Sequence, residues 1–204
     1  MEALSPALYA ILASEGRSDL TNPQKSIAAS VLLAAEVWDL LNAGILWGVS
    51  SRRFHAGRQP LAADLDHLTQ THRAILVDGA SCPSEVYRML SAPGPCLERE
   101  DDYRRMQGPW PIEKPVDYGD MATAIRQKVR QVALGKTPSP ADDALLVALF
   151  RASWLRGFYI RSTMDQVTLS KRLKALRRKP PMAGGWPLPD LIMAFLLLRE
   201  FSRI

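Results

Sequence analysis

Cysteine is nearly absent from this 204-residue chain, which contains only Cys82 and Cys96. The two residues form no CxxC pair and follow no secretory leader, so we expect neither a disulfide framework nor a zinc site. Neither thiol has a recognisable activating motif, so we also expect no cysteine chemistry. A reducing, cytoplasmic setting is the prediction that follows.

Long apolar runs are also missing. The longest strongly apolar run extends from Leu191 to Leu198, whereas a helix that spans a bilayer needs about 20 such residues. We therefore expect no transmembrane helix, although a chain of this kind can still lie on a membrane surface.

Catalytic motifs are the third absence. There is no GxSxG elbow, and the segment Gly135 to Thr137 ends like a phosphate-binding loop but has Arg130 where that motif requires its first glycine. The acidic and histidine side chains between Asp64 and His72 lack the HExxH spacing of a zinc site. The sequence therefore predicts no enzymatic activity, no metal and no cofactor.

The composition is that of an ordinary folded protein, with 47% hydrophobic and 23% charged residues. The length predicts one domain covering residues 1–204. A formal net charge of +5 favours anionic partners, such as phospholipid headgroups or nucleic acid, although so small a charge narrows the choice only weakly.

Two segments are apolar on nearly every face and are predicted to be buried helices packed side by side: Ile27 to Leu41 and Asp142 to Phe158. Pro140 and the acidic pair Asp142–Asp143 suit the start of the second helix. The turn from Asn42 to Gly44 ends the first helix, and a strand is expected to follow it and run into the basic turn at Arg52 and Arg53.

The remaining periodic patterns predict shorter amphipathic helices. Together they indicate an all-α, α-dominant fold, a compact bundle of amphipathic helices around buried central ones, with one or two small β-hairpins. The expected elements are a helix or strand at Ala7 to Ala13 and helices at Leu61 to Val77, Ser84 to Leu90, Met121 to Val132, Leu169 to Leu176 and Pro187 to Phe201.

A basic helix face is the clearest candidate for a binding surface. Three leucines, Leu169, Leu173 and Leu176, form one stripe, and we expect the basic residues around them to form a cationic face that attracts lipid phosphates. An ordinary solvated helix face is the alternative. Six basic residues lie in this segment: Lys171, Arg172, Lys174, Arg177, Arg178 and Lys179. Of these, Lys171, Lys174 and Arg178 are predicted to bind lipid.

Cations adjoin apolar side chains at two further places, a combination that suits the boundary between headgroups and acyl chains. Arg52 and Arg53 precede Phe54 in the first place. In the second, Arg104 and Arg105 are followed by Met106 and Trp110, although Trp110 could equally be a core residue. The four arginines are candidate lipid-binding residues.

Two stretches carry a family resemblance. SVLLAAEVWDLLNAGIL, from Ser30 to Leu46, and IRQKVRQVALGKTPSPADDALLVALFRASWL, from Ile125 to Leu155, resemble helices of the Golgi phosphoprotein 3 family, which is all-α. The order of LYAILASEGR, PLAADLDHLTQ and KRLKALR agrees with this family as well.

The resemblance implies a cytoplasmic, peripherally membrane-associated protein that recognises phosphatidylinositol 4-phosphate, binds membrane-protein clients and self-associates. It also places a membrane-inserting hairpin near residues 104–112, with Met106, Trp110 and Ile112 as the inserting side chains. The chain departs from the family at Leu33, which stands where eukaryotic members have a headgroup-binding arginine, so the specific lipid pocket is not supported.

These observations favour a peripheral membrane-associating adaptor or accessory protein that binds anionic lipid, a membrane-protein client, or both. A winged-helix-like nucleic-acid-binding regulator is the alternative, with Leu46 to Phe54 as the wing, but its recognition helix, Ile27 to Leu41, has no polar series for base edges. A purely structural partner subunit, docking through its apolar carboxy-terminal helix, is a further alternative.

Overall fold

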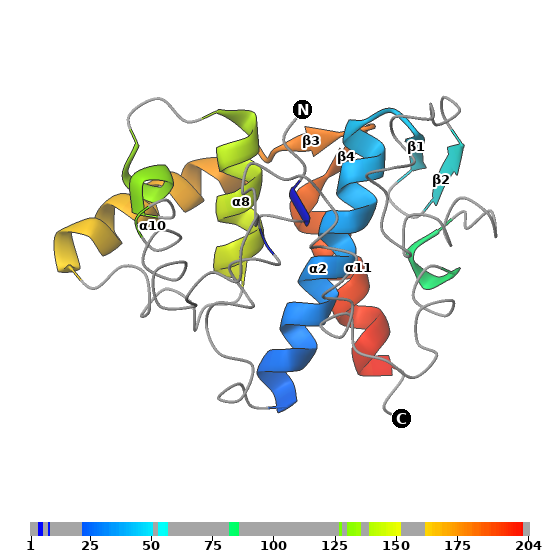
Figure 1. Cartoon of the computed structure of the whole chain (residues 1–204), viewed down its shortest axis with the longest axis horizontal. Coiled ribbons are helices and arrows are strands. Elements are labelled where there is room, and N and C mark those ends of the chain that lie inside the picture. Colours follow the sequence, from blue (N-terminus) through cyan, green and yellow to red (C-terminus); the bar gives the residue numbers. More distant parts are fainter. Residues whose placement is uncertain are drawn as a thin grey trace, which may run out of the picture.

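The fold is dominated by helices, as predicted, and includes two small antiparallel hairpins (Figure 1). The computed structural model describes residues 4–5, 8, 22–50, 53–56, 82–85, 127, 130–135, 139–151 and 162–201. Its elements are α2 (Asn22–Asn42), β1 (Leu46–Ser50), β2 (Arg53–Ala56), α8 (Pro140–Arg151), α10 (Thr163–Arg178), β3 (Met182–Ala183), β4 (Trp186–Pro187) and α11 (Leu188–Phe201).

The core forms around α2, which is buried on all sides along residues 30–38 and again at Leu40 and Leu41. This burial confirms the prediction from its all-round apolar sequence. Helix α11 lies alongside α2 and also contacts α8, while α10 packs against α8 (Figure 1). Within the described part of the chain, the most extensive packing partner of α2 is therefore α11 and not α8, the partner expected from the sequence, because α11 supplies an equally apolar face.

A glycine ends α2 where the sequence predicts. Gly44 has a φ of 71°, and its N–H donates to the carbonyl of Leu41, while the N–H of Ile45 donates to the carbonyl of Leu40. This pair of hydrogen bonds is the Schellman arrangement, which needs a residue in the left-handed region. The chain then turns directly into β1.

The two hairpins are locked to each other and to the core. The N–H of Gly48 in β1 donates to the carbonyl of Gly184, which lies in the turn between β3 and β4, at 2.6 Å. A Cβ atom on Gly48 would overlap the indole of Trp186, so only glycine allows this close approach. Trp186 in turn meets Phe54 of β2 edge to face, with ring centroids 6.2 Å apart.

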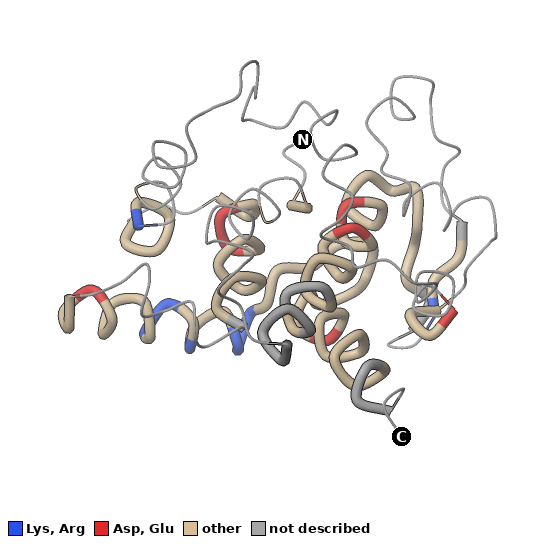
Figure 2. Tube along the Cα trace, turned by 60° about the horizontal axis from the view of Figure 1, so that its bottom comes forward, with Lys and Arg blue, Asp and Glu red and all other residues tan. Residues whose placement is uncertain are grey.

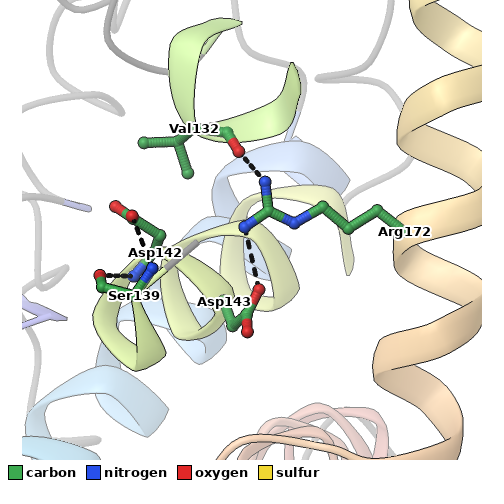
Figure 3. Close-up of polar contacts among 5 residues, drawn as sticks. All are labelled: Val132, Ser139, Asp142, Asp143 and Arg172. Atoms are coloured by element: carbon green, nitrogen blue, oxygen red, sulfur yellow. Dashed lines mark hydrogen bonds and ion pairs between the residues drawn. The ribbon is translucent and has the colours of Figure 1, made fainter. Parts of the chain in front are cut away.

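The start of α8 has reciprocal capping. The N–H of Asp142 donates to the hydroxyl of Ser139, and the N–H of Ser139 donates to the carboxylate of Asp142 (Figure 3). Pro140 occupies the first helical position, where the missing N–H is not needed. The predicted start of this helix is confirmed, and its predicted continuation to Phe158 extends beyond the described residues.

The smaller predicted helices are covered only in part. Residues 127 and 130–134 are helical and Gly135 follows the helix, as expected, and residues 83–85 are helical at the start of the predicted Ser84 to Leu90 segment. The predicted helix Leu61 to Val77 lies outside the described residues, as does Ala7 to Ala13 apart from Leu8. Helix α11 confirms the last predicted helix. None of the helices that the structure describes has the length and apolarity to cross a bilayer.

Candidate functional site

Helix α10 has one buried and one exposed side, and it lies at one end of the longest axis of the molecule (Figure 1). Leu169 is buried, and Leu173 and Leu176 pack partly buried against the hydrophobic cluster. Lys171, Lys174 and Arg178 are exposed, and the helical angle of about 100° per residue places all three on the side opposite the leucines. Basic residues follow one another along this helix in Figure 2.

Two apolar side chains continue this exposed side toward the start of α10. Met164 is 76% exposed and Val167 is 46% exposed. Val167 is four residues before Lys171 and seven before Lys174, so the three share a face. We call Met164, Val167, Lys171, Lys174 and Arg178 the outer face of α10.

A shallow groove runs along the same helix. Its volume is about 370 Å³. Its walls are mainly apolar, with a smaller contribution from the polar atoms of the lining side chains. The described lining residues are Thr163, Gln166, Val167, Ser170, Lys171 and Lys174.

Arg172 interrupts the cationic face that the sequence predicts. Its side chain is only 13% exposed. Nη1 of the guanidinium donates to the carbonyl of Val132, and Nη2 pairs with the carboxylate of Asp143 at 3.0 Å (Figure 3). Arg172 therefore turns inward and holds α10 against the start of α8. The assignment of all six basic residues to one solvent-facing surface was wrong for this residue.

A second ion pair holds the beginning of α10. Arg130 donates to the carboxylate of Asp165 at 3.1 Å, with side chains 62% and 22% exposed. An exposed pair of this kind contributes little stability, on the order of 0–1 kcal/mol. Together with Arg172 it nevertheless fixes which side of α10 faces the core, and so leaves the outer face free.

The second predicted lipid-binding region, around Arg53, is changed by the structure. Arg53 is exposed on β2, but Phe54 is 1% exposed and belongs to the core. The apolar side chain that accompanies Arg53 at the surface is Trp47 of β1, which is 53% exposed. Alternation along the predicted strand could have revealed the exposure of Trp47, because a buried Leu46 places Trp47 on the opposite face.

The structure does not bring all the predicted site residues together. The β1–β2 hairpin and α10 lie toward opposite ends of the longest axis (Figure 1). The remaining predicted residues lie outside the described part of the chain, and their role stays a prediction: Arg52, Arg104, Arg105, Met106, Trp110 and Ile112.

One partly buried carboxylate holds the amino-terminal segment against α2. Asp39 accepts hydrogen bonds from the N–H of Leu4 at 2.6 Å, from the N–H of Ser5 at 2.9 Å and from the Ser5 hydroxyl at 2.5 Å. Burial raises the pKa of Asp39 to about 6, and the three hydrogen bonds oppose this shift. No local sequence pattern points to Asp39, since its partners Leu4 and Ser5 are more than 30 residues away in the chain.

Metal chemistry finds no support among the residues described here, where no three His, Cys, Asp or Glu side chains gather closely enough to hold an ion. Cys82 is a free thiol whose sulfur lies 3.0 Å from the hydroxyl of Ser84. The candidate site is therefore a surface of cations and apolar groups.

Comparison of the chain with protein-family models, with curated proteins and with solved structures gives no match.

Proposed function

We propose that this protein is a peripheral adaptor or accessory protein that docks on anionic membrane surfaces through the outer face of α10. The observation that carries the proposal is the exposure of Lys171, Lys174 and Arg178 on the side opposite the buried leucines, next to the exposed Met164 and Val167. A membrane interface offers phosphates for the cations and an acyl boundary for the apolar groups.

The strength expected of this contact is modest. Each lysine or arginine close to an anionic leaflet contributes about 1 kcal/mol, so three of them correspond to roughly a hundredfold gain in partitioning. The apolar side chains add contact area that salt does not screen. Reversible association is the result, as an accessory protein requires.

The resemblance to the Golgi phosphoprotein 3 family supports the same class of function and suggests phosphatidylinositol 4-phosphate as the lipid. In this chain, however, Leu33 occupies the position of the family's headgroup arginine and is buried within α2. We therefore propose recognition of negative charge at the surface, and a membrane-protein client or self-association as further properties of the adaptor.

The two alternative functions fit the structure less well. A winged-helix protein would use α2 as its recognition helix, but residues 30–38 of α2 are enclosed by the core and cannot enter a DNA groove. A subunit docking through its carboxy-terminal helix would need a free apolar face. Leu191, Ile192 and Phe195 of α11 instead lie fully buried in the core.

The proposal is tested by reversing the charge of the outer face. Replacing Lys171, Lys174 and Arg178 by glutamate changes the formal net charge from +5 to −1 and leaves the leucine stripe intact. The partition coefficient onto vesicles containing anionic lipid, measured by cosedimentation at 0.1 M salt, should fall by roughly a hundredfold. Wild-type binding should also weaken strongly at 1 M salt, where the Debye length is about 3 Å.

A charge-matched pair of variants separates the outer face from net charge. Lys171→Glu with Lys174→Glu should lose more binding than Arg177→Glu with Lys179→Glu, although each pair lowers the net charge by the same amount. Circular dichroism controls for folding. Equal vesicle binding by the wild type and the triple variant would remove the outer face of α10 from the mechanism.

A further inference from the structure

The β1–β2 hairpin presents a second surface that combines an aromatic side chain with a cation. Trp47 lies opposite His55 in the strand register, and Arg53 lies two residues before His55 on β2. All three are exposed, while Leu46, before Trp47, and Phe54, between Arg53 and His55, are buried. The alternation places Trp47, Arg53 and His55 together on one side, which we call the hairpin outer face.

This face is held rigidly. Phe54 packs against Trp186 from the inner side, and the N–H of Gly48 is bonded to the carbonyl of Gly184. Trp186 also packs closely against Gly48, the residue that follows Trp47 in β1. The inner side of the hairpin is therefore occupied by Trp186, and Trp47 lies on the opposite side, where it is half exposed.

We propose that the hairpin outer face is a second contact with the anionic membrane surface, with Trp47 in the interfacial layer and Arg53 against lipid phosphates. Tryptophan prefers this layer because its ring is apolar and its N–H can still be hydrated. The positive charge of Arg53 is complementary to an anionic leaflet. The inference rests on the proposed membrane function and adds a contact that the outer face of α10 does not provide.

Two contacts at opposite ends of the molecule have a geometric consequence. If both contacts touch one bilayer, the longest axis of the molecule lies along the membrane surface. The second contact then forms in a molecule that the first contact already holds on the membrane. Each contact can then be weak by itself. Loss of either one should weaken binding of the whole protein.

The test is the substitution Trp47→Ala in the full chain. It removes roughly 50 Å² or more of apolar contact, which corresponds to about tenfold weaker partitioning onto vesicles that contain anionic lipid. Trp47→Tyr should retain most of the binding, because tyrosine is also an interfacial residue. Leu197→Ala is the matched control, since Leu197 is an exposed apolar residue of α11 outside both faces.

Quenching of tryptophan fluorescence by brominated lipids supplies a direct measurement. Of the other four tryptophans, Trp38 and Trp186 are buried, and Trp110 and Trp154 lie outside the described residues. Quenching is therefore compared between the wild type and Trp47→Phe at lipid concentrations that bind both proteins fully, so that the quenching lost reports contact of Trp47 with lipid. Weaker binding by Trp47→Ala, together with this loss of quenching, supports the inference.

Two outcomes separate this inference from the proposed function. In the first, the charge changes in α10 weaken vesicle binding but Trp47→Ala does not. This result overturns the hairpin contact alone and would point to a protein partner for that face. Absence of wild-type binding to anionic vesicles overturns both. Equal weakening by Leu197→Ala would also overturn the inference, because general loss of apolar surface would then explain the effect.

Discussion

Asp39 shows how a single partly buried carboxylate can make stability depend on pH. The ordinary pKa of an aspartate is 3.8, and burial raises the pKa of Asp39 to about 6. Between these two values the folded protein binds more protons than the unfolded chain, so the free energy of unfolding must decrease as the pH rises through this window. The stabilising contribution is complete below about pH 4 and is lost above about pH 6.

The substitution Asp39→Asn removes this titration and tests it. A shift of about two pKa units corresponds to roughly 3 kcal/mol. The difference in the free energy of unfolding, variant minus wild type, measured in urea, should therefore be up to roughly 3 kcal/mol more positive at pH 7 than at pH 4. Asparagine keeps one carbonyl oxygen as an acceptor for the amino-terminal N–H groups. An unchanged difference between the two proteins across this pH range would show that the pKa of Asp39 is not raised.

At the scale of the helix, Arg172 is the residue that orients α10. Its guanidinium joins the carbonyl of Val132 and the carboxylate of Asp143, which belong to two other segments. Replacing it by methionine keeps most of the apolar stem of the side chain but removes these bonds. We expect Arg172→Met to lower the free energy of unfolding by about 1–3 kcal/mol, the usual size for hydrogen bonds to charged groups.

Arg177→Met is the control for this prediction, because it removes the same charge from an exposed position of the same helix. It should change stability by less than about 0.5 kcal/mol. Chemical denaturation of both variants decides between an orienting role and a general charge effect. Equal losses in the two variants would contradict the orienting role of Arg172.

The sequence predicted the elements better than their contacts. All-round apolarity was sufficient to identify α2 as buried, and the leucine stripe was sufficient to locate α10 and its exposed lysines. The inward turn of Arg172 could not be predicted, since its partners Val132 and Asp143 are 40 and 29 residues away in the chain. Local periodicity also could not distinguish α8 from α11 as the partner of α2, because both helices have wide apolar faces.

At the scale of the whole molecule, one hydrophobic cluster connects the two candidate membrane contacts. It includes Leu169 of α10, Leu149 of α8, Phe195 of α11 and Phe54 of β2. A continuous core of this kind favours cooperative unfolding of the chain as one domain, which is the organisation that the length predicts. It also fixes the orientation of the outer face of α10 relative to the hairpin outer face.

The substitution Leu149→Ala tests this cooperativity. Leu149 is fully buried, so the cavity left by alanine should lower the free energy of unfolding by about 2–5 kcal/mol. Leu197→Ala is the same chemical change at a position that is 47% exposed, and it should cost less than about 0.5 kcal/mol. Circular dichroism follows the helices, whereas tryptophan fluorescence combines signals from five tryptophans, including Trp38 of α2, Trp47 of β1 and Trp186 of β4. If the chain is one cooperative unit, Leu149→Ala must lower both transition midpoints together, because a loss in α8 destabilises the hairpins through the shared core. A fluorescence transition that stays at the wild-type midpoint while the helical signal moves would show that the chain does not unfold as one cooperative unit.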